Sequence, residues 1–442
     1  MPTCALVTLG CKVNQYDSQA IREELARLGY REVGAAMAAD LYVVNTCCVT
    51  HESHRKSLQH VRRLARAHPE AVLVVTGCSA ETSAEEIRAI PGVRLVAGND
   101  AKPLLARMAA AIGGSGRLSQ EPVLSPMPGE AGGPPPAWPS IHGFAGHTRA
   151  FVKIEDGCND FCSYCIVPRV RGRVRSRPPG EVVEEVRRLA ANGHLEVVLT
   201  GIHLGAYGSE TGGAWGLVPL LERLVATPGL RRLRLSSIEL REVGDELIEL
   251  AAHAAVLCPH FHIPLQSGDD AVLRAMNRHY TAADFLARLD AIRAKIAEPA
   301  LSTDIIVGFP GETDEQFRRT VEVARRAAFS RVHVFPYSDR EGTAASRMAG
   351  KVAKAGIDAR RAQMLAAARE LARAYHERFV GRAVEALVET QRDRRTGQLC
   401  GYTERYVRAF FDGPDELRGK LAQVVAAKAT PRGLEASGAD RR

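Results

Sequence analysis

The sequence has no run of the roughly 18 to 20 uninterrupted apolar residues that a membrane-spanning helix requires. Its first residues, Met1 to Val7, also lack the basic segment and apolar core of a secretory signal peptide. Without these features, we expect a cytoplasmic protein that is not attached to a membrane. No internal repeat at a fixed period is visible, which argues against a repeat architecture.

Disulfides are not expected either, although the chain contains 10 cysteines. The cytosol keeps thiols reduced, and a chain of 442 residues can bury enough core to fold without cross-links. Clustered cysteines in such a protein indicate metal binding or catalysis.

The length of 442 residues predicts about three domains, at roughly 100–200 residues each. Hydrophobic residues make up 45% of the chain and charged residues 25%, which is typical of a soluble globular protein. The net charge of +8 and the pI near 9.0 favour a polyanionic partner, because lysine and arginine neutralise phosphates.

Residues 1–112 are predicted to form an open parallel α/β sheet. Short apolar runs alternate there with amphipathic stretches of helical length. The expected strands are residues 5–9, 41–45, 72–76 and 93–96. The expected helices, with apolar residues at spacings of three and four, are residues 17–28, 54–67 and 83–90.

Residues 113–147 are predicted to be a linker, since they are rich in Gly and Pro and have little apolar periodicity. Residues 148–378 should then form a full or partial (βα)6 barrel, because six strands alternate with helices. The working edge of such a barrel is the carboxyl end of its strands. The expected strands are residues 150–154, 196–200, 232–236, 260–264, 304–307 and 331–335.

Residues 379–442 are predicted to form a small antiparallel β-barrel, similar to an OB fold and of the kind that binds nucleic acids. The expected strands are residues 384–389, 397–403, 405–411 and 419–425. Tyr402, Tyr406, Arg408 and Phe410 would share one face by alternation. That face is either a platform for stacked bases or the core of the barrel.

Cys158, Cys162 and Cys165 lie close together on a loop after the first barrel strand. Three thiolates hold only three irons of a four-iron cluster, so one iron stays open, as the metal of a catalytic site does. A zinc loop is the alternative, but zinc sites usually combine two cysteine pairs, and no second pair is nearby. The spacing therefore favours an iron–sulfur cluster with catalytic use.

Cys11, Cys47 and Cys78 each follow a different predicted strand of the first domain. Because parallel strands end at one edge of a sheet, these thiols should converge and could hold a second cluster. Three independent buried cysteines are the alternative. Cys48 leaves the middle ligand ambiguous, and we expect Cys47. The remaining cysteines lack partners at metal-binding spacing and are expected in the core: Cys4, Cys258 and Cys400.

Two further segments could bind anions or nucleotides. A Gly-rich turn at a strand end would let a nucleoside approach the backbone at Gly308, Gly311 and Glu312, although it could be an ordinary turn. A basic segment could bind phosphate or carboxylate by paired hydrogen bonds, or be a solvated loop. Its arginines are Arg169, Arg171, Arg173, Arg175 and Arg177.

With both triads placed, the chain resembles the methylthiotransferase family of radical S-adenosylmethionine (SAM) enzymes over nearly its whole length. The matching segments are residues 8–18, 45–47, 76–78 and 157–165. The resemblance implies two 4Fe-4S clusters, one at the Cys158 triad that binds SAM and an auxiliary one at the Cys11 triad that handles sulfur. It also implies a C-terminal TRAM domain, which residues 401–408 resemble, and a cofactor motif that contains His262 and Gln266. The long linker and Cys48 depart from the family pattern.

Residues 10–15 and 200–205 resemble the branch that acts on N6-threonylcarbamoyladenosine at position 37 of tRNA, 3′ of the anticodon. This implies methylthiolation of adenine C2 with two SAM molecules per turnover: one donates a methyl group and one is cleaved to a carbon radical. The expected partners are tRNA, an electron donor such as a flavodoxin or ferredoxin, and a sulfur donor. We expect a monomer.

Two alternatives stay open. One is a methylthiotransferase that acts on isopentenyladenosine in tRNA or on a ribosomal protein. The other is a non-catalytic iron–sulfur protein that binds RNA, although such a role does not require an open iron.

Overall fold

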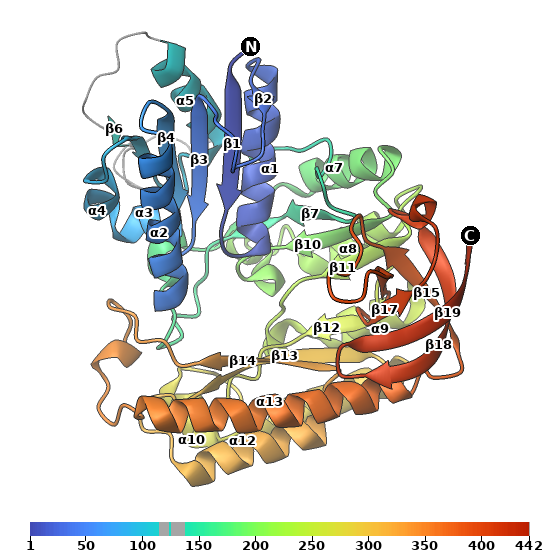
Figure 1. The fold of residues 1–442 in the computed structure, drawn as a ribbon. Helices are drawn as coiled ribbons and strands as arrows, with labels where there is room; N and C mark the ends of the chain where they lie inside the picture. Colours follow the sequence, from blue (N-terminus) through green and yellow to red (C-terminus); the bar gives the residue numbers. More distant parts are fainter. Residues whose placement is uncertain (115–122, 125–137, 442) are drawn as a thin grey trace.

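The computed structural model describes residues 1–114, 123–124 and 138–441. Its N-terminal unit is a six-stranded parallel sheet with the order β2-β1-β3-β4-β5-β6 (Figure 1). Strands β3 and β4 are buried along their whole length because helices cover both faces of the sheet. The strands are β1 (Thr3–Thr8), β2 (Arg31–Glu32), β3 (Leu41–Thr46), β4 (Val72–Gly77), β5 (Val93–Ala97) and β6 (Val123–Leu124).

Two hydrophobic clusters fill the two faces of this sheet, one under α2 and α4 and the other under α1 and α5. Helix α1 begins directly after Cys11, earlier than predicted. Its first turns bury the polar residues Asn14, Asp17 and Ser18, so the apolar periodicity starts late. The helices are α1 (Lys12–Arg27), α2 (His51–Ala67), α3 (Cys78–Thr82), α4 (Ala84–Arg88) and α5 (Leu105–Gly114).

The central unit contains two three-stranded parallel sheets, β11-β10-β7 and β12-β13-β14. Two isolated bridges, Leu233–Leu257 and Ser237–His262, join them between β11 and β12. The result is the predicted open (βα)6 barrel. Its strands are β7 (Ala150–Lys153), β10 (Glu196–Thr200), β11 (Arg232–Leu235), β12 (His260–His262), β13 (Ala300–Val307) and β14 (Arg331–Pro336).

Helices cover the outside of these strands and bury one large hydrophobic cluster against them. Capping boxes at Thr281 and Thr313 fix the starts of α11 and α12. The helices are α6 (Val167–Arg171), α7 (Pro179–Ala191), α8 (Leu217–Val225), α9 (Asp245–His253), α10 (Asp270–Ala275), α11 (Ala282–Lys295), α12 (Asp314–Ala327) and α13 (Lys354–Glu377).

The C-terminal unit is a closed barrel in the order β15-β16-β17-β19-β18. One pair, β17 with β19, is parallel, whereas the prediction was a purely antiparallel barrel. Strand β19 was not predicted, and residues 404–407 form a turn before β17. The strands are β15 (Ala383–Val388), β16 (Leu399–Thr403), β17 (Arg408–Phe411), β18 (Leu421–Thr430) and β19 (Gly433–Arg441).

Parts of the predicted linker belong to the folded units. Strand β6 pairs with β5 at the sheet edge, and Ile141 and Phe144 are buried in the core of the central unit. Residues 115–122 and 125–137 of that linker lie outside the described residues.

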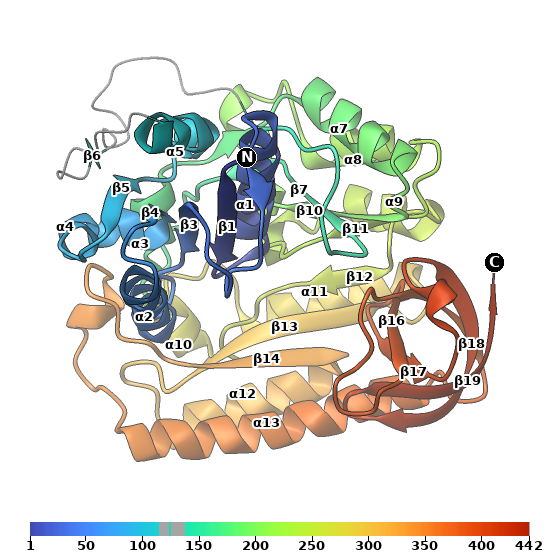
Figure 2. The same ribbon diagram turned by 45° about the horizontal axis from the view of Figure 1, so that its top comes forward.

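The N-terminal sheet sits over the mouth of the open barrel, while the small C-terminal barrel lies at another side of the central unit, beside β12 and the end of α13 (Figures 1 and 2). Among the described residues, no helix combines the length and apolar character needed to cross a membrane.

Candidate functional site

The loop from β8 (Glu155–Asp156) to α6 carries Cys158, Cys162 and Cys165. Strand β8 pairs with β9 (Arg175–Ser176), and the backbone N–H of Cys158 donates to the carbonyl of Gly172 over 3.1 Å. Gly157 has φ +90°, and a Cβ there would lie 2.0 Å from the carbonyl oxygen of Arg173. Only glycine therefore lets the cysteine loop lie this close to residues 172–173, which precede β9.

Hydrogen-bond donors surround the sulfurs of this loop. The backbone N–H of Asp160 lies 3.4 Å and His203 Nδ1 3.6 Å from Cys158 Sγ. The Arg278 guanidinium lies 3.4 Å from Cys162 Sγ. Although burial opposes protonation, the hydrogen bonds to Cys158 and Glu242 raise the pKa of His203 to about 11. Both ring nitrogens of His203 have partners, because Nε2 lies 3.0 Å from Glu242 Oε1, so these groups suit hydrogen bonding to cluster sulfur.

Burial raises the pKa of the Cys165 thiol to about 12 and also raises that of Cys162. Both thiols would stay protonated at neutral pH unless a metal ion displaced the protons. Three soft thiolates with hydrogen bonds to sulfur form the ligand set of an iron–sulfur cluster, so these residues fit that cofactor.

The second set of cysteines lies at the carboxyl edge of the N-terminal sheet. Cys11, Cys47 and Cys78 follow β1, β3 and β4, as predicted. Gly10 has φ +98°, and a Cβ there would lie 2.9 Å from Cys47 Sγ. Burial raises the pKa of Cys47. A backbone hydrogen bond lowers it, and the charges of Cys78 and Cys11 raise it further. Cys47 thus lies close to both other thiols.

Cys48 complicates this arrangement, because its thiol forms a hydrogen bond with Cys78. That bond, with help from Arg171 and Lys102, holds the pKa of Cys78 well below its usual range. A thiolate at Cys78 suits a metal ligand. Cys48 and Cys78 pack against Ile166, which directly follows Cys165, and against Val170 of α6. The edge with the second triad therefore contacts the loop with the first.

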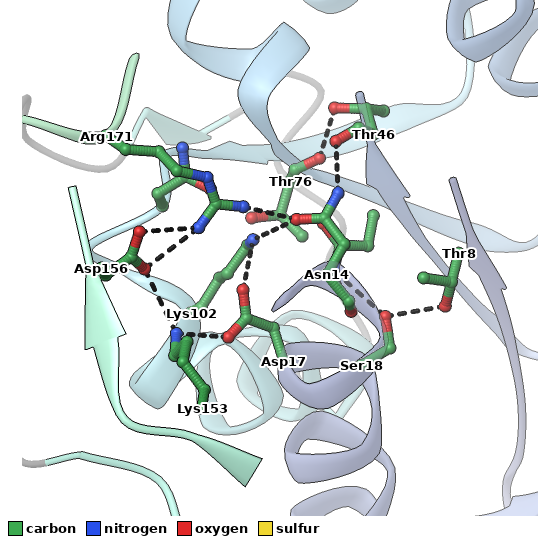
Figure 3. A network of polar contacts seen from close by, with 12 residues as sticks. Thr8, Asn14, Asp17, Ser18, Thr46, Thr76, Lys102, Lys153, Asp156 and Arg171 are labelled. Atoms are coloured by element: carbon green, nitrogen blue, oxygen red, sulfur yellow. Dashed lines mark hydrogen bonds and ion pairs between the residues drawn. The ribbon is translucent and has the colours of Figure 1, made fainter. Parts of the chain in front are cut away.

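A buried polar network ties the two units together at this contact (Figure 3). Arg171 forms an ion pair with Asp156 at 2.9 Å and donates to Asn14 Oδ1 over 2.6 Å. Lys153 pairs with Asp17 of α1 at 2.5 Å, and Lys102 pairs with the same carboxylate at 2.8 Å. Asn14 also donates to the carbonyl of Thr46, and Thr46 Oγ1 to that of Thr76, next to Cys47 and Cys78. The network thereby links both cysteine sets.

Of the five arginines that could bind phosphate or carboxylate, Arg171 and Arg177 are buried and have internal partners. The Arg171 side chain is 1% exposed and committed to the network described above. Arg177 is buried and pairs with Glu185 at 3.1 Å. Exposed and buried arginines follow one another in this segment because it runs through the interface between the N-terminal and central units. The sequence alone does not distinguish the two kinds. Arg169 and Arg173 are exposed, and Arg175 lies 3.5 Å from Asp100, so these three can still face a ligand.

The residues predicted to bind the cofactor are at the expected strand ends, but two have structural partners. Glu312 accepts from the Gly308 N–H over 2.7 Å and pairs with Arg360 at 2.8 Å, so its carboxylate holds the turn against α13. Gly308 (φ +77°) and Gly311 (φ +81°) are left-handed. Gln266 has φ +65°, and its backbone pairs with β13. A cofactor contact of Gly308, Gly311, Glu312 or Gln266 stays a prediction.

A cavity of about 830 Å³ lies between all three units. Cys11 and Lys12 line it from the N-terminal unit, and His262, Asp304 and His333 from the barrel strands. Tyr402 and Tyr406 line it from the C-terminal barrel, with their rings stacked 4.8 Å apart. Phe410 of the predicted aromatic face is instead buried under Arg408 and Arg432. No sequence pattern indicated the histidine–aspartate cluster, since its members come from three strands.

Comparisons with known proteins agree with this arrangement. The profile of the Radical SAM superfamily matches residues 152–324, and that of uncharacterized protein family UPF0004 matches residues 3–98. A solved structure of the radical S-adenosylmethionine methyltransferase TsrM from Kitasatospora setae superposes with a TM-score of 0.54 at 18% identity, over 76% of this chain and 73% of its own. The open barrel with the Cys158 loop thus defines a radical SAM protein.

Curated relatives define the family more closely. The threonylcarbamoyladenosine tRNA methylthiotransferase MtaB of Bacillus subtilis (strain 168) is 37% identical over 97% of this chain and 94% of its own length. The protein of the same name from Thermotoga maritima is 38% identical over 93% and 92%. A tRNA-2-methylthio-N(6)-dimethylallyladenosine synthase from Jannaschia sp. (strain CCS1) is 34% identical over 97% and 92%. The chain belongs to the methylthiotransferase family of radical SAM enzymes.

Proposed function

We propose that this protein methylthiolates C2 of N6-threonylcarbamoyladenosine at position 37 of tRNA. The observation that carries the proposal is the shared cavity: Cys11 of the second triad opens onto the same space as the barrel interior and Tyr402 and Tyr406 of the C-terminal barrel. A nucleoside held there would lie beside the edge of the N-terminal sheet that carries Cys11. The curated relatives from Bacillus and Thermotoga carry the name of this activity.

Each cysteine set has its own task in this proposal. Cys158, Cys162 and Cys165 would hold the 4Fe-4S cluster that binds SAM, and Cys11, Cys47 and Cys78 the auxiliary cluster. With SAM, such clusters supply one-electron chemistry and a site for sulfur. The chain itself positions them: Arg278 and His203 donate toward the sulfurs of the first set, and Arg171 fixes the second set against the first.

The C-terminal barrel would bind the RNA. Tyr402 and Tyr406 present stacked rings to the cavity, and aromatic rings stack on bases without sequence preference. Arg169 and Arg173 are exposed cations for phosphate. We further propose a cytoplasmic monomer that receives electrons from a flavodoxin or ferredoxin and sulfur from a separate donor.

Nucleoside mass spectrometry of tRNA from cells with and without this gene tests the proposal. We expect the 2-methylthio derivative of threonylcarbamoyladenosine to disappear on deletion and to return with the intact gene but not with Cys158→Ala. If only the methylthio derivative of isopentenyladenosine disappears, the protein has the second activity found among its relatives. A change confined to a ribosomal protein would place the substrate outside tRNA.

A further inference from the structure

The cavity between the three units is strongly cationic. The side chains of six lysine and arginine residues line it, against a single carboxylate, Asp304, which pairs with His262 at 3.1 Å. The cations are Lys12, Arg234, Arg331, Arg405, Arg408 and Arg432. An anion is therefore the ligand that the cavity favours.

Four of these cations already have partners. Arg234 pairs with Glu196 at 2.8 Å, and Arg405 pairs with Glu404. Arg408 and Arg432 share Asp393 at 3.6 and 2.9 Å. These side chains hold the C-terminal barrel together or dock it on the central unit.

Lys12 and Arg331 differ from the other four. Within the described part of the chain, no carboxylate lies within ion-pair distance of either side chain, and neither donates a hydrogen bond that would fix its position. Lys12 directly follows Cys11 at the start of α1, and Arg331 opens β14. The two residues thus face the cavity from different units.

Lys12 and Arg331 line the cavity together with His260 and His333. Burial lowers the pKa of His260 and His333, and Lys12 and Arg331 contribute to both shifts. The two histidines consequently stay neutral at physiological pH. The positive charge in the cavity that is free for a ligand comes from Lys12 and Arg331, next to the edge that carries Cys11.

We propose that Lys12 and Arg331 bind the carboxylate of the threonylcarbamoyl group and thereby select this nucleoside over adenosines with an uncharged N6 substituent. The inference rests on the proposed function. A carboxylate in this position would place the modified base beside Cys11, because Lys12 is its neighbour in the chain. An isopentenyl group offers no charge to the same two side chains, so its binding gains no such ion pair.

Binding of synthetic anticodon stem-loops to the cluster-loaded protein, measured by fluorescence anisotropy, tests this assignment. The loops are identical except at position 37, which carries threonylcarbamoyladenosine, its uncharged methyl ester, isopentenyladenosine or adenosine. We expect the wild-type protein to bind the carboxylate loop roughly tenfold more tightly than the ester loop, the size expected for one charge-assisted hydrogen bond.

Lys12→Gln and Arg331→Gln should each abolish most of that difference and leave binding of the ester loop unchanged. The ester loop therefore reports in the same experiment whether the variant is folded. Lys295→Gln is the matched control, since Lys295 lies on the outer helix α11 and pairs with Glu249 at 2.7 Å. It should retain the full preference for the carboxylate.

Two outcomes would overturn the assignment. If both variants weaken binding of all four loops equally, Lys12 and Arg331 bind backbone phosphate instead of the carboxylate. If neither variant changes any affinity, the two cations do not contact the RNA. A wild-type protein that binds and methylthiolates only the isopentenyladenosine loop would instead contradict the proposed function, which the variants do not test.

Discussion

The two cysteine sets of this protein are built in different ways. Cys158, Cys162 and Cys165 lie on one short loop, whose shape depends on Gly157 and a few backbone hydrogen bonds. Cys11, Cys47 and Cys78 come from the ends of three strands and meet only when the whole sheet has folded. The first set is thus a local feature of the sequence, whereas the second is a property of the fold.

Because of this difference, the two sets take their hydrogen-bond donors and buried cations from different parts of the molecule. The loop set has hydrogen-bond donors within its own unit, His203 and Arg278. The strand-end set relies on Arg171 and Lys153, which reach from the central unit to Asn14 and Asp17 of the N-terminal unit, and on Lys102, which pairs with Asp17 inside that unit. We therefore expect changes at the interface to affect the second set before the first.

Replacing one cysteine in each set should give the largest effects, and the two replacements should affect different activities. Cys158→Ala should abolish both SAM cleavage and tRNA methylthiolation, because it removes a ligand of the cluster that binds SAM. Cys78→Ala should abolish methylthiolation but retain SAM cleavage. Chromatographic measurement of 5′-deoxyadenosine, alongside nucleoside analysis, distinguishes the two variants. Equal loss of SAM cleavage in both would show that the sets do not act separately.

A second test concerns the identity of the middle ligand. Cys47→Ser should lose about half of the bound iron, as expected for one of two four-iron clusters. Cys48→Ser should retain nearly all of it, since the Cys48 thiol donates a hydrogen bond to Cys78, whereas Cys47 lies near both Cys78 and Cys11. Iron analysis of the anaerobically reconstituted proteins measures both. The reverse result would assign Cys48 as the ligand.

The interface network allows a third test. Arg171→Met should lower the free energy of unfolding by about 4 kcal/mol, because it leaves the buried Asp156 carboxylate without its closest partner. The auxiliary iron should be lost more readily than the iron of the loop set. Arg173→Met is the control, since Arg173 is exposed. Denaturant titration gives the stability, and unchanged values for Arg171→Met would refute the role of the network.

The smallest expected effect is a change of stability with pH. It comes from His333, which lines the same cavity as Cys11. Burial, assisted by Arg331, lowers the pKa of His333 to about 4, while Asp304 opposes and His262 and Lys12 assist this shift. The unfolded chain takes up this proton near pH 6.5. Stability should therefore be complete above about pH 6.5 and fall as the pH decreases toward 4.

His333→Gln should reduce that loss, and the difference in melting temperature between pH 7 and pH 5 measures it. An identical pH dependence in wild type and His333→Gln would mean that other groups cause the loss.

The same contrast between local and long-range features decides which parts of the structure the sequence could predict. Close cysteine spacing and apolar runs identified the loop set, the sheet and the open barrel, because both signals are local. The roles of Arg171 and Arg177 could not be predicted, since their partners Asp156, Asn14 and Glu185 become neighbours only in the folded chain. Strand β19 was missed because its sequence, rich in Gly, Ala and charged residues, lacks the β-branched pattern of a strand.

The central claim is that the two cysteine sets act together on one modified base. Incubation of the reconstituted protein with SAM, a reductant and tRNA that carries threonylcarbamoyladenosine, followed by mass spectrometry of the nucleosides, tests it most directly. We expect this nucleoside to gain one methylthio group with the wild-type protein and none with Cys158→Ala or Cys78→Ala. An unchanged nucleoside with the fully loaded wild-type protein, or a product formed without an intact second set, would contradict it.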